Sequence, residues 1–215
     1  MNYPKEPTEL AQVNSPDYDS RLIGENELGS VHLHGPFGDE ESPVKIAYVI
    51  GMHPLESKSH RALFEKLTSK NDLRNCYFLY NINVNDKSSQ TEGRLEGQLL
   101  AQEFIRDDII NKGYDLFLDI HSNRGAQGPG EYKITNFVFA PGFDEESSKY
   151  MDIIIDSIDE IQYYVPEFRS SPPYITEPTA KAGIPTLVYE CYSSEDFRLT
   201  CRLAEKLISV VDGLF

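Results

Sequence analysis

The chain has 215 residues, with 20 lysines and arginines against 35 aspartates and glutamates, a formal net charge of −15. This length can bury a full core in one domain without disulfides or a structural metal. The acidic balance excludes a typical nucleic-acid binder and argues against docking on anionic membranes. The N-terminus lacks the apolar core of a signal peptide, and no apolar run is long enough to cross a bilayer. We therefore expect a protein of the cytoplasm.

The three cysteines are Cys76, Cys191 and Cys201. Their number is odd and no C-x-x-C pair occurs, which excludes a disulfide framework and a thiolate zinc knuckle. We expect free thiols.

The predicted elements follow from periodicity and punctuation along the chain. Residues 1–27 are polar and interrupted by proline, so we expect an irregular segment there and a single domain over residues 28–215. Apolar and β-branched runs predict strands at residues 29–37, 44–51, 76–84, 114–120, 134–140 and 185–189. Helical spacing predicts helices near 57–70, 95–111 and 145–163, with a last helix after the capping pair Ser193 and Asp196. Residues 85–93, 123–130 and 170–184 are expected loops.

Strands alternate with helices along the predicted domain. This alternation is typical of the α/β class with a largely parallel central sheet. In such sheets ligands bind beyond the carboxyl ends of the strands. The residues at those ends are therefore the first candidates for a functional site.

The first candidate pair follows the strand that ends at Gly51. His53 begins the sequence H-P-L-E, and Glu56 ends it. A histidine and a glutamate three residues apart, on a turn leaving a strand, can reach one metal ion together. The motif is common by chance, so it needs support from other parts of the chain.

Two other strands supply that support. His121 ends the apolar run Y-D-L-F-L-D-I, and Glu190 ends the run P-T-L-V-Y. Because the carboxyl ends of parallel strands meet at one edge, we expect both residues to converge with His53 and Glu56.

The chemistry of this set is that of a catalytic metal site. Two histidines and one carboxylate leave the fourth position of a zinc ion open for water, whose pKa zinc lowers towards neutrality. Glu190 is then the candidate general base, which would pass the proton to a leaving amine. Asp119, two residues before His121, lies on the same strand face and could accept a hydrogen bond from a ligand imidazole.

The order of these motifs resembles the zinc carboxypeptidase superfamily, which also includes aspartoacylase and succinylglutamate desuccinylase. The resemblance implies one zinc ion held by His53, Glu56 and His121, with Glu190 catalytic. It also implies a mixed sheet flanked by helices and the hydrolysis of an amide bond. H-P-L-E and N-V-N-D replace the H-G-N-E and D-L-N-R of the acylase branch. The substrate thus stays open between a peptide C-terminus and an N-acyl amino acid.

Two arginines and one tyrosine are candidates for contacts with a small-molecule or peptide substrate that carries a carboxylate. The arginine fork binds carboxylates bidentately. Arg94 precedes a predicted helix and Arg124 follows His121 by three residues, so either could hold a substrate carboxylate or stabilise an oxyanion. Tyr174, in the proline-rich loop, could cover the site.

Other interpretations stay open. The chain could be a metal- or ligand-binding module that lacks hydrolysis, or a deacylase or esterase acting on a sugar-linked amide. His32 and His34 share a strand face and could form a second metal site, although packing is the usual role of such pairs. His60 is expected on the exposed side of its helix. No G-x-S-x-G elbow and no phosphate-binding glycine loop is present.

Overall fold

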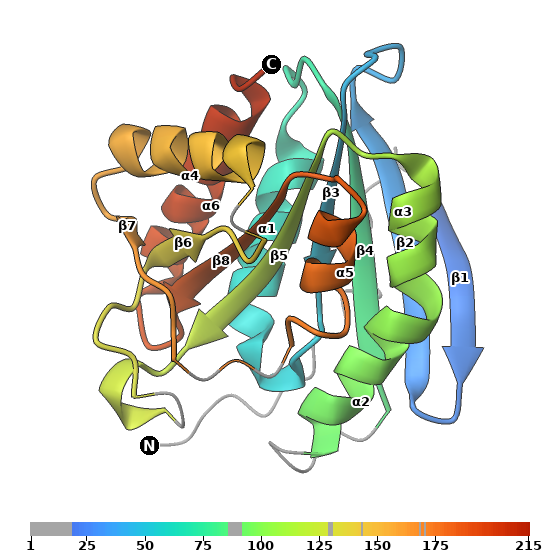
Figure 1. Cartoon of the computed structure of the whole chain (residues 1–215), viewed down its shortest axis with the longest axis horizontal. Helices are drawn as coiled ribbons and strands as arrows, with labels where there is room; N and C mark the ends of the chain where they lie inside the picture. Colours follow the sequence, from blue (N-terminus) through green and yellow to red (C-terminus); the bar gives the residue numbers. More distant parts are fainter. Residues whose placement is uncertain (1–18, 86–91, 129–130, 143, 168, 170) are drawn as a thin grey trace.

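The computed structural model describes residues 19–85, 92–128, 131–142, 144–167, 169 and 171–215. Within them, eight strands form one sheet in the order β1-β2-β4-β3-β5-β8-β6-β7 (Figure 1). The strands are β1 Ser20–Asn26, β2 Gly29–Gly38, β3 Lys45–Ile50, β4 Cys76–Val84, β5 Leu116–Asn123, β6 Phe137–Phe139, β7 Gln162–Tyr163 and β8 Thr186–Tyr192. The helices are α1 Ser57–Ser69, α2 Glu92–Leu100, α3 Arg106–Lys112, α4 Glu145–Ser157, α5 Thr176–Lys181 and α6 Phe197–Asp212.

The centre of the sheet is parallel and its borders are mixed. Strands β4, β3, β5 and β8 run in one direction, whereas β2 is antiparallel to β4 and β6 is antiparallel to β8. Every residue of β5 is buried, as expected for a strand covered on both faces. The predicted α/β class with a mixed, largely parallel sheet flanked by helices is confirmed.

Helices cover both faces of the sheet. Helices α1, α4 and α6 pack on one face, and α2, α3 and α5 lie on the other (Figure 1). The apolar spacing predicted an inner stripe on α6, of which Leu203 and Leu207 are buried and Leu199, Val210 and Leu214 are partly buried against the core. None of the described helices has the length and apolarity to cross a bilayer.

Two segments that were predicted to be irregular contain regular structure. Residues 20–26, predicted as irregular, form the edge strand β1; residues 1–18 lie outside the described part of the chain. An edge strand pairs on one side only and is mostly exposed here, so it lacks the alternation that reveals a half-buried strand. The proline-rich stretch 170–184, predicted as a loop, contains helix α5.

Helix bounds also differ from the prediction. Helix α4 ends at Ser157, but Ile158 and Ile161 remain buried beyond it, so the apolar spacing continued past the helix and suggested an end at residue 163. The helix predicted at 95–111 is two α-helices joined by a π-helical turn, Ala101–Ile105. Asp196 caps α6 by accepting a hydrogen bond from Arg198 N, whereas Ser193 lies upstream of the helix.

The prediction that His60 lies on the exposed side of its helix is wrong, because the residue is fully buried. Its Nε2 atom lies 3.0 Å from the carbonyl oxygen of Ile120, within β5. A backbone acceptor of this kind makes a polar side chain acceptable on the inner face of α1, and hydropathy spacing does not reveal it.

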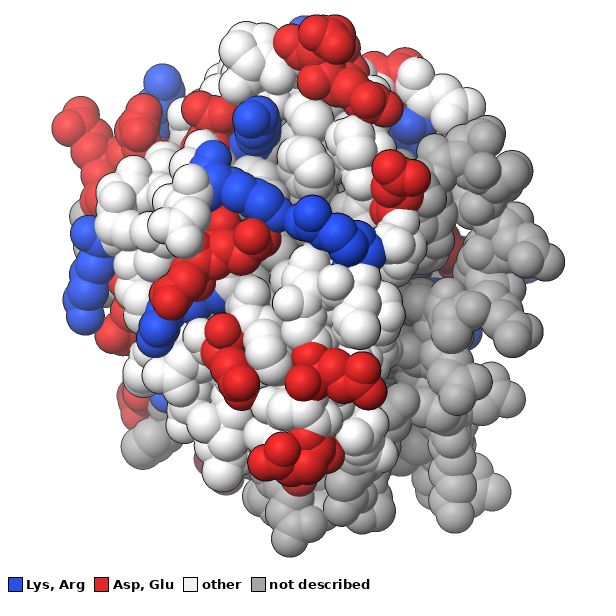
Figure 2. All heavy atoms as spheres, turned by 90° about the vertical axis from the view of Figure 1, so that its right-hand side faces the viewer, with Lys and Arg blue, Asp and Glu red and all other residues white. Residues whose placement is uncertain are grey.

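Surface charges alternate in sign on the face that carries α3. Figure 2 shows acidic side chains around a short row of basic ones in its described part. On α3 itself, Lys112 pairs with Asp108 at 2.6 Å, and Arg106 pairs with Asp107 at 2.8 Å. Such exposed or half-exposed pairs contribute little to stability.

Asp212 ties the end of α6 to the start of β4, and its removal tests the fold. The buried carboxylate accepts hydrogen bonds from the backbone nitrogens of Arg74 and Asn75 and from the Tyr77 hydroxyl. Because Asp212→Ala leaves these donors unpaired, we expect a loss of about 2–4 kcal/mol in the free energy of unfolding, measured in urea. The exposed Asp152→Ala is the control, and an equal loss there would contradict this role.

Candidate metal centre

The loop after β3 places the first two candidates. Gly51 has a φ of +86°, and a Cβ atom there would lie 2.1 Å from the carbonyl oxygen of Ile82. Glycine therefore lets the chain turn sharply against β4. His53 then adopts extended backbone, and Pro54–Glu56 form one turn of 3₁₀ helix. This turn brings the side chains of His53 and Glu56 together.

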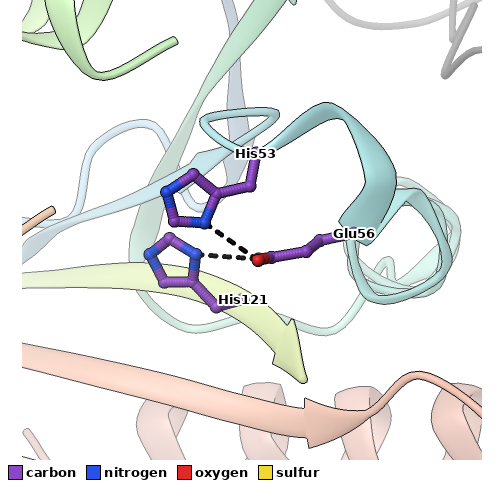
Figure 3. A group of neighbouring side chains, drawn as sticks. All are labelled: His53, Glu56 and His121. Atoms are coloured by element: carbon purple, nitrogen blue, oxygen red, sulfur yellow. Dashed lines mark hydrogen bonds and ion pairs between the residues drawn. The ribbon is translucent and has the colours of Figure 1, made fainter. Parts of the chain in front are cut away.

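His121 meets this pair from β5, which lies beside β3. Figure 3 shows the Glu56 carboxylate facing both imidazoles. Its Oε1 lies 2.9 Å from His53 Nδ1, and its Oε2 lies 2.9 Å from His121 Nδ1. The backbone nitrogen of Ser122 also donates to Oε2, at 3.1 Å. We call His53, Glu56 and His121 the His–Glu–His cluster.

The cluster is buried, and burial acts differently on its members. Burial raises the pKa of Glu56, but the two histidines outweigh it and hold that pKa well below its usual value. Burial lowers the pKa of His53 to about 4 despite the neighbouring carboxylate. Burial also disfavours the charged form of His121, but Asp119 and Glu56 together raise its pKa well above the usual value. Glu56 is therefore ionised at neutral pH.

The donor set of this cluster fits a metal ion. One donor atom from each residue lies within 4.8 Å of the others, and all three side chains are buried. Imidazole nitrogen and carboxylate oxygen are ligands that zinc accepts. Asp119 is fully buried, and its Oδ2 lies 2.9 Å from the Nε2 atom of His121, which faces away from Glu56. Such backing of an imidazole is typical of metal ligands.

Glu190 lies beside the cluster on β8, where the register pairs it with His121. Asn123 donates to its Oε2 at 3.2 Å through Nδ2, which also donates to Thr135 O. Burial, with the charge of Glu56 adding to it, raises the pKa of Glu190 to about 8. A carboxyl group with this pKa can take up and release a proton near neutral pH.

The three predicted substrate contacts occupy different places. Arg94, on α2, lies against the cluster: its guanidinium donates to Glu56 Oε1 at 2.8 Å, and its side chain is 36% exposed. Arg124 is partly buried at the start of the 3₁₀ turn Gly125–Gln127. Tyr174 is partly buried in the turn before α5. The substrate roles of all three stay predictions.

Gln98 is a contact of the cluster that sequence reasoning missed. Its Nε2 atom lies 3.2 Å from His53 Nε2, and its side chain is buried. It stands four residues after Arg94, so both side chains leave the same side of α2. This spacing was the available signal, but a lone glutamine carries no metal-site pattern of its own.

The suggested second site at His32 and His34 has another explanation. Their rings stack with centroids 6.3 Å apart, and His34 packs edge-on against Phe64 of α1. Within the described ranges, the His–Glu–His cluster alone has the geometry of a three-residue metal site. Packing accounts for the H-x-H pair.

No protein-family model and no curated protein matches the chain. Among solved structures, it is similar to a metallo-carboxypeptidase from Burkholderia cenocepacia, with 15% identity and a TM-score of 0.59. It is also similar to one from Pseudomonas aeruginosa in complex with (2-guanidinoethylmercapto)succinic acid, with 15% identity and a TM-score of 0.58. The matches cover 92% and 91% of this chain and 64% of each neighbour, so the chain spans less than two thirds of their length. The chain has the fold of the metallo-carboxypeptidases.

Proposed function

We propose that the chain is a metal-dependent hydrolase of an amide bond, with one zinc ion held by His53, Glu56 and His121. The observation that supports this most strongly is the placement of both Nδ1 atoms 2.9 Å from one buried carboxylate. Three residues from two strand ends thus direct their donor atoms to one place, at the sheet edge where ligands bind.

A zinc ion held by these three residues would supply a Lewis acid, able to polarise the scissile carbonyl and lower the pKa of a water molecule. Glu190 accepts the proton of the attacking water and passes it to the leaving amine. Asn123 orients that carboxyl group by donating to Oε2. The Asp119 carboxylate lies against His121 Nε2 on the side opposite Glu56 and stabilises the ring through its charge.

The proposed substrate carries a carboxylate, as a peptide C-terminus or an N-acyl amino acid does. Arg94 is the first candidate to bind it, because its guanidinium is half-exposed beside the cluster. Arg124 is the second candidate, for the same carboxylate or for the oxyanion, and Tyr174 would cover the bound substrate. The expected compartment is the cytoplasm.

A metal- or ligand-binding module without hydrolysis is the second candidate. The contact between Arg94 and Glu56 Oε1 favours a module that binds a ligand without a metal, because it occupies an oxygen that a cation would need. The two functions differ in turnover and not in fold.

Zinc content and turnover measured together test both functions. We expect about one zinc per chain by elemental mass spectrometry, and hydrolysis of at least one member of a panel of peptides and N-acyl amino acids. Zinc without turnover would favour the binding module. No zinc after add-back and removal of excess would contradict the hydrolase and favour a module that binds a ligand without a metal.

Arg94 should affect substrate binding more than metal binding. Arg94→Met removes the cation beside Glu56, so zinc affinity should stay equal or rise. The KM for substrates with a carboxylate should increase by about 10–100-fold, the value of one charge-assisted hydrogen-bond pair. Steady-state kinetics on zinc-loaded protein, with exposed Arg61→Met as the control, measure this. An unchanged KM would remove Arg94 from the substrate site.

A further inference from the structure

We propose that Gln98 is the positioning residue of His53, and that its amide serves both tautomers of that imidazole, one without the metal ion and one with it. The inference rests on the proposed metal site, because it concerns how His53 comes to present Nδ1. It assigns a role to a residue of α2 that belongs to none of the motifs of the sequence.

The orientation of the Gln98 amide assigns the proton of His53 to one ring nitrogen. The Nε2 atoms of Gln98 and His53 are 3.2 Å apart. With its amide nitrogen facing the ring, as here, Gln98 is the donor and His53 Nε2 accepts with its lone pair. The remaining proton is then on Nδ1, which donates to Glu56 Oε1 at 2.9 Å. This arrangement is the Nδ1–H tautomer of His53, which we assign to the protein without the ion.

Binding of a cation reverses these roles. Nδ1 must offer its lone pair to the ion, and the proton of the neutral imidazole then belongs on Nε2. The donor amide of Gln98 would oppose that proton. A half-turn of the amide about its last side-chain bond presents Oε1 instead, which accepts from Nε2–H. The proton count of the ring is unchanged, because Nδ1 loses one proton and Nε2 gains one by exchange with water.

The packing of helix α2 places Gln98 next to His53. A Cβ atom on Gly97 would lie 2.0 Å from the carbonyl oxygen of Met52. The helix therefore packs directly on the backbone next to His53, at a distance that only glycine permits. Gln98 is 3% exposed, so water competes little for its amide.

The two imidazoles of the cluster are consequently backed by different groups. Asp119 carries only acceptor oxygens next to His121 Nε2, whereas the Gln98 amide offers a donor and an acceptor to His53 Nε2. An aliphatic side chain at position 98 would satisfy neither tautomer. A carboxylate there would satisfy only the Nε2–H tautomer, which is the metal-ligating one.

Zinc affinity of four proteins, measured by competition with a chromophoric chelator, tests the role. We expect Gln98→Leu to bind zinc about 10–100-fold more weakly than the wild type. Gln98→Glu should bind at least as tightly as the wild type, because it favours Nε2–H. The exposed Gln162→Leu is the matched control and should not change the affinity. Equal affinity in Gln98→Leu, or equal loss in Gln98→Glu, would overturn the proposal.

The ¹⁵N shifts of the His53 ring give a second readout that does not need the metal. In metal-free wild type, Nδ1 should carry the proton and Nε2 should not; in metal-free Gln98→Glu, Nε2 should be protonated. Thermal unfolding of each variant shows whether it is folded. If the wild type binds no zinc, the proposed function fails, while these shifts still test the contact between Gln98 and His53. Unchanged shifts in Gln98→Glu would contradict the inference alone.

Discussion

Glu190→Gln is expected to lower turnover by about 10²–10⁴-fold while zinc remains bound, because the amide cannot accept the proton of the attacking water. The substitution keeps the shape of the side chain, and its carbonyl oxygen can still accept from Asn123 Nδ2. The kcat of zinc-loaded protein and its zinc content, measured on the same sample, give the result.

A glutamate away from the site provides the control for this variant. Glu146, on the exposed side of α4, should tolerate Glu146→Gln with no change in kcat. Zinc loss in Glu190→Gln would identify Glu190 as a ligand. Retained turnover in Glu190→Gln would exclude Glu190 as the general base.

The second large effect concerns the metal ion itself. His53→Ala and His121→Ala each remove one of three donors, so zinc affinity should fall by more than the roughly 100-fold that follows loss of a supporting contact. Elemental mass spectrometry after gel filtration should find zinc in the wild type and in neither variant.

His60 is the matched control for these two substitutions. It is also a buried histidine, but its Nε2 atom contacts the carbonyl oxygen of Ile120 and it is not part of the cluster. His60→Ala should therefore destabilise the fold by about 1–3 kcal/mol through the unpaired carbonyl and the lost packing, and should keep its zinc. Zinc retained in His53→Ala or His121→Ala would contradict the proposed ligand set.

The strand ends were the most predictable part of the molecule. Buried parallel strands are short apolar runs, and a polar residue at the end of such a run stands out. This is why His53, His121 and Glu190 could be placed at one sheet edge although they are distant in sequence. Arg94 was predicted just before a helix, whereas it lies inside α2, and its contact with Glu56 could not be predicted.

The parts that escaped prediction share a physical cause. His60 is stabilised inside the fold by one backbone oxygen, and β1 by pairing with a single neighbour. Gln98 is directed at His53 by the packing of α2 on Met52. Each depends on a partner far away in sequence, and periodicity records only which side of an element is apolar.

The π-helical turn Ala101–Ile105 decides which side chains of α2 face His53 and Glu56. Successive residues of an α-helix are rotated by about 100°, and about 3.6 residues complete a turn. In an uninterrupted α-helix, Gln98 would lie on the same helix face as the buried Ile105 and Ile109. Because a π turn contains one additional residue, Gly97 lies on that face instead of Gln98. The π turn thus rotates α2 relative to the residues that follow it. Ile105 and Ile109 pack into the core, while Gln98 of α2 faces His53.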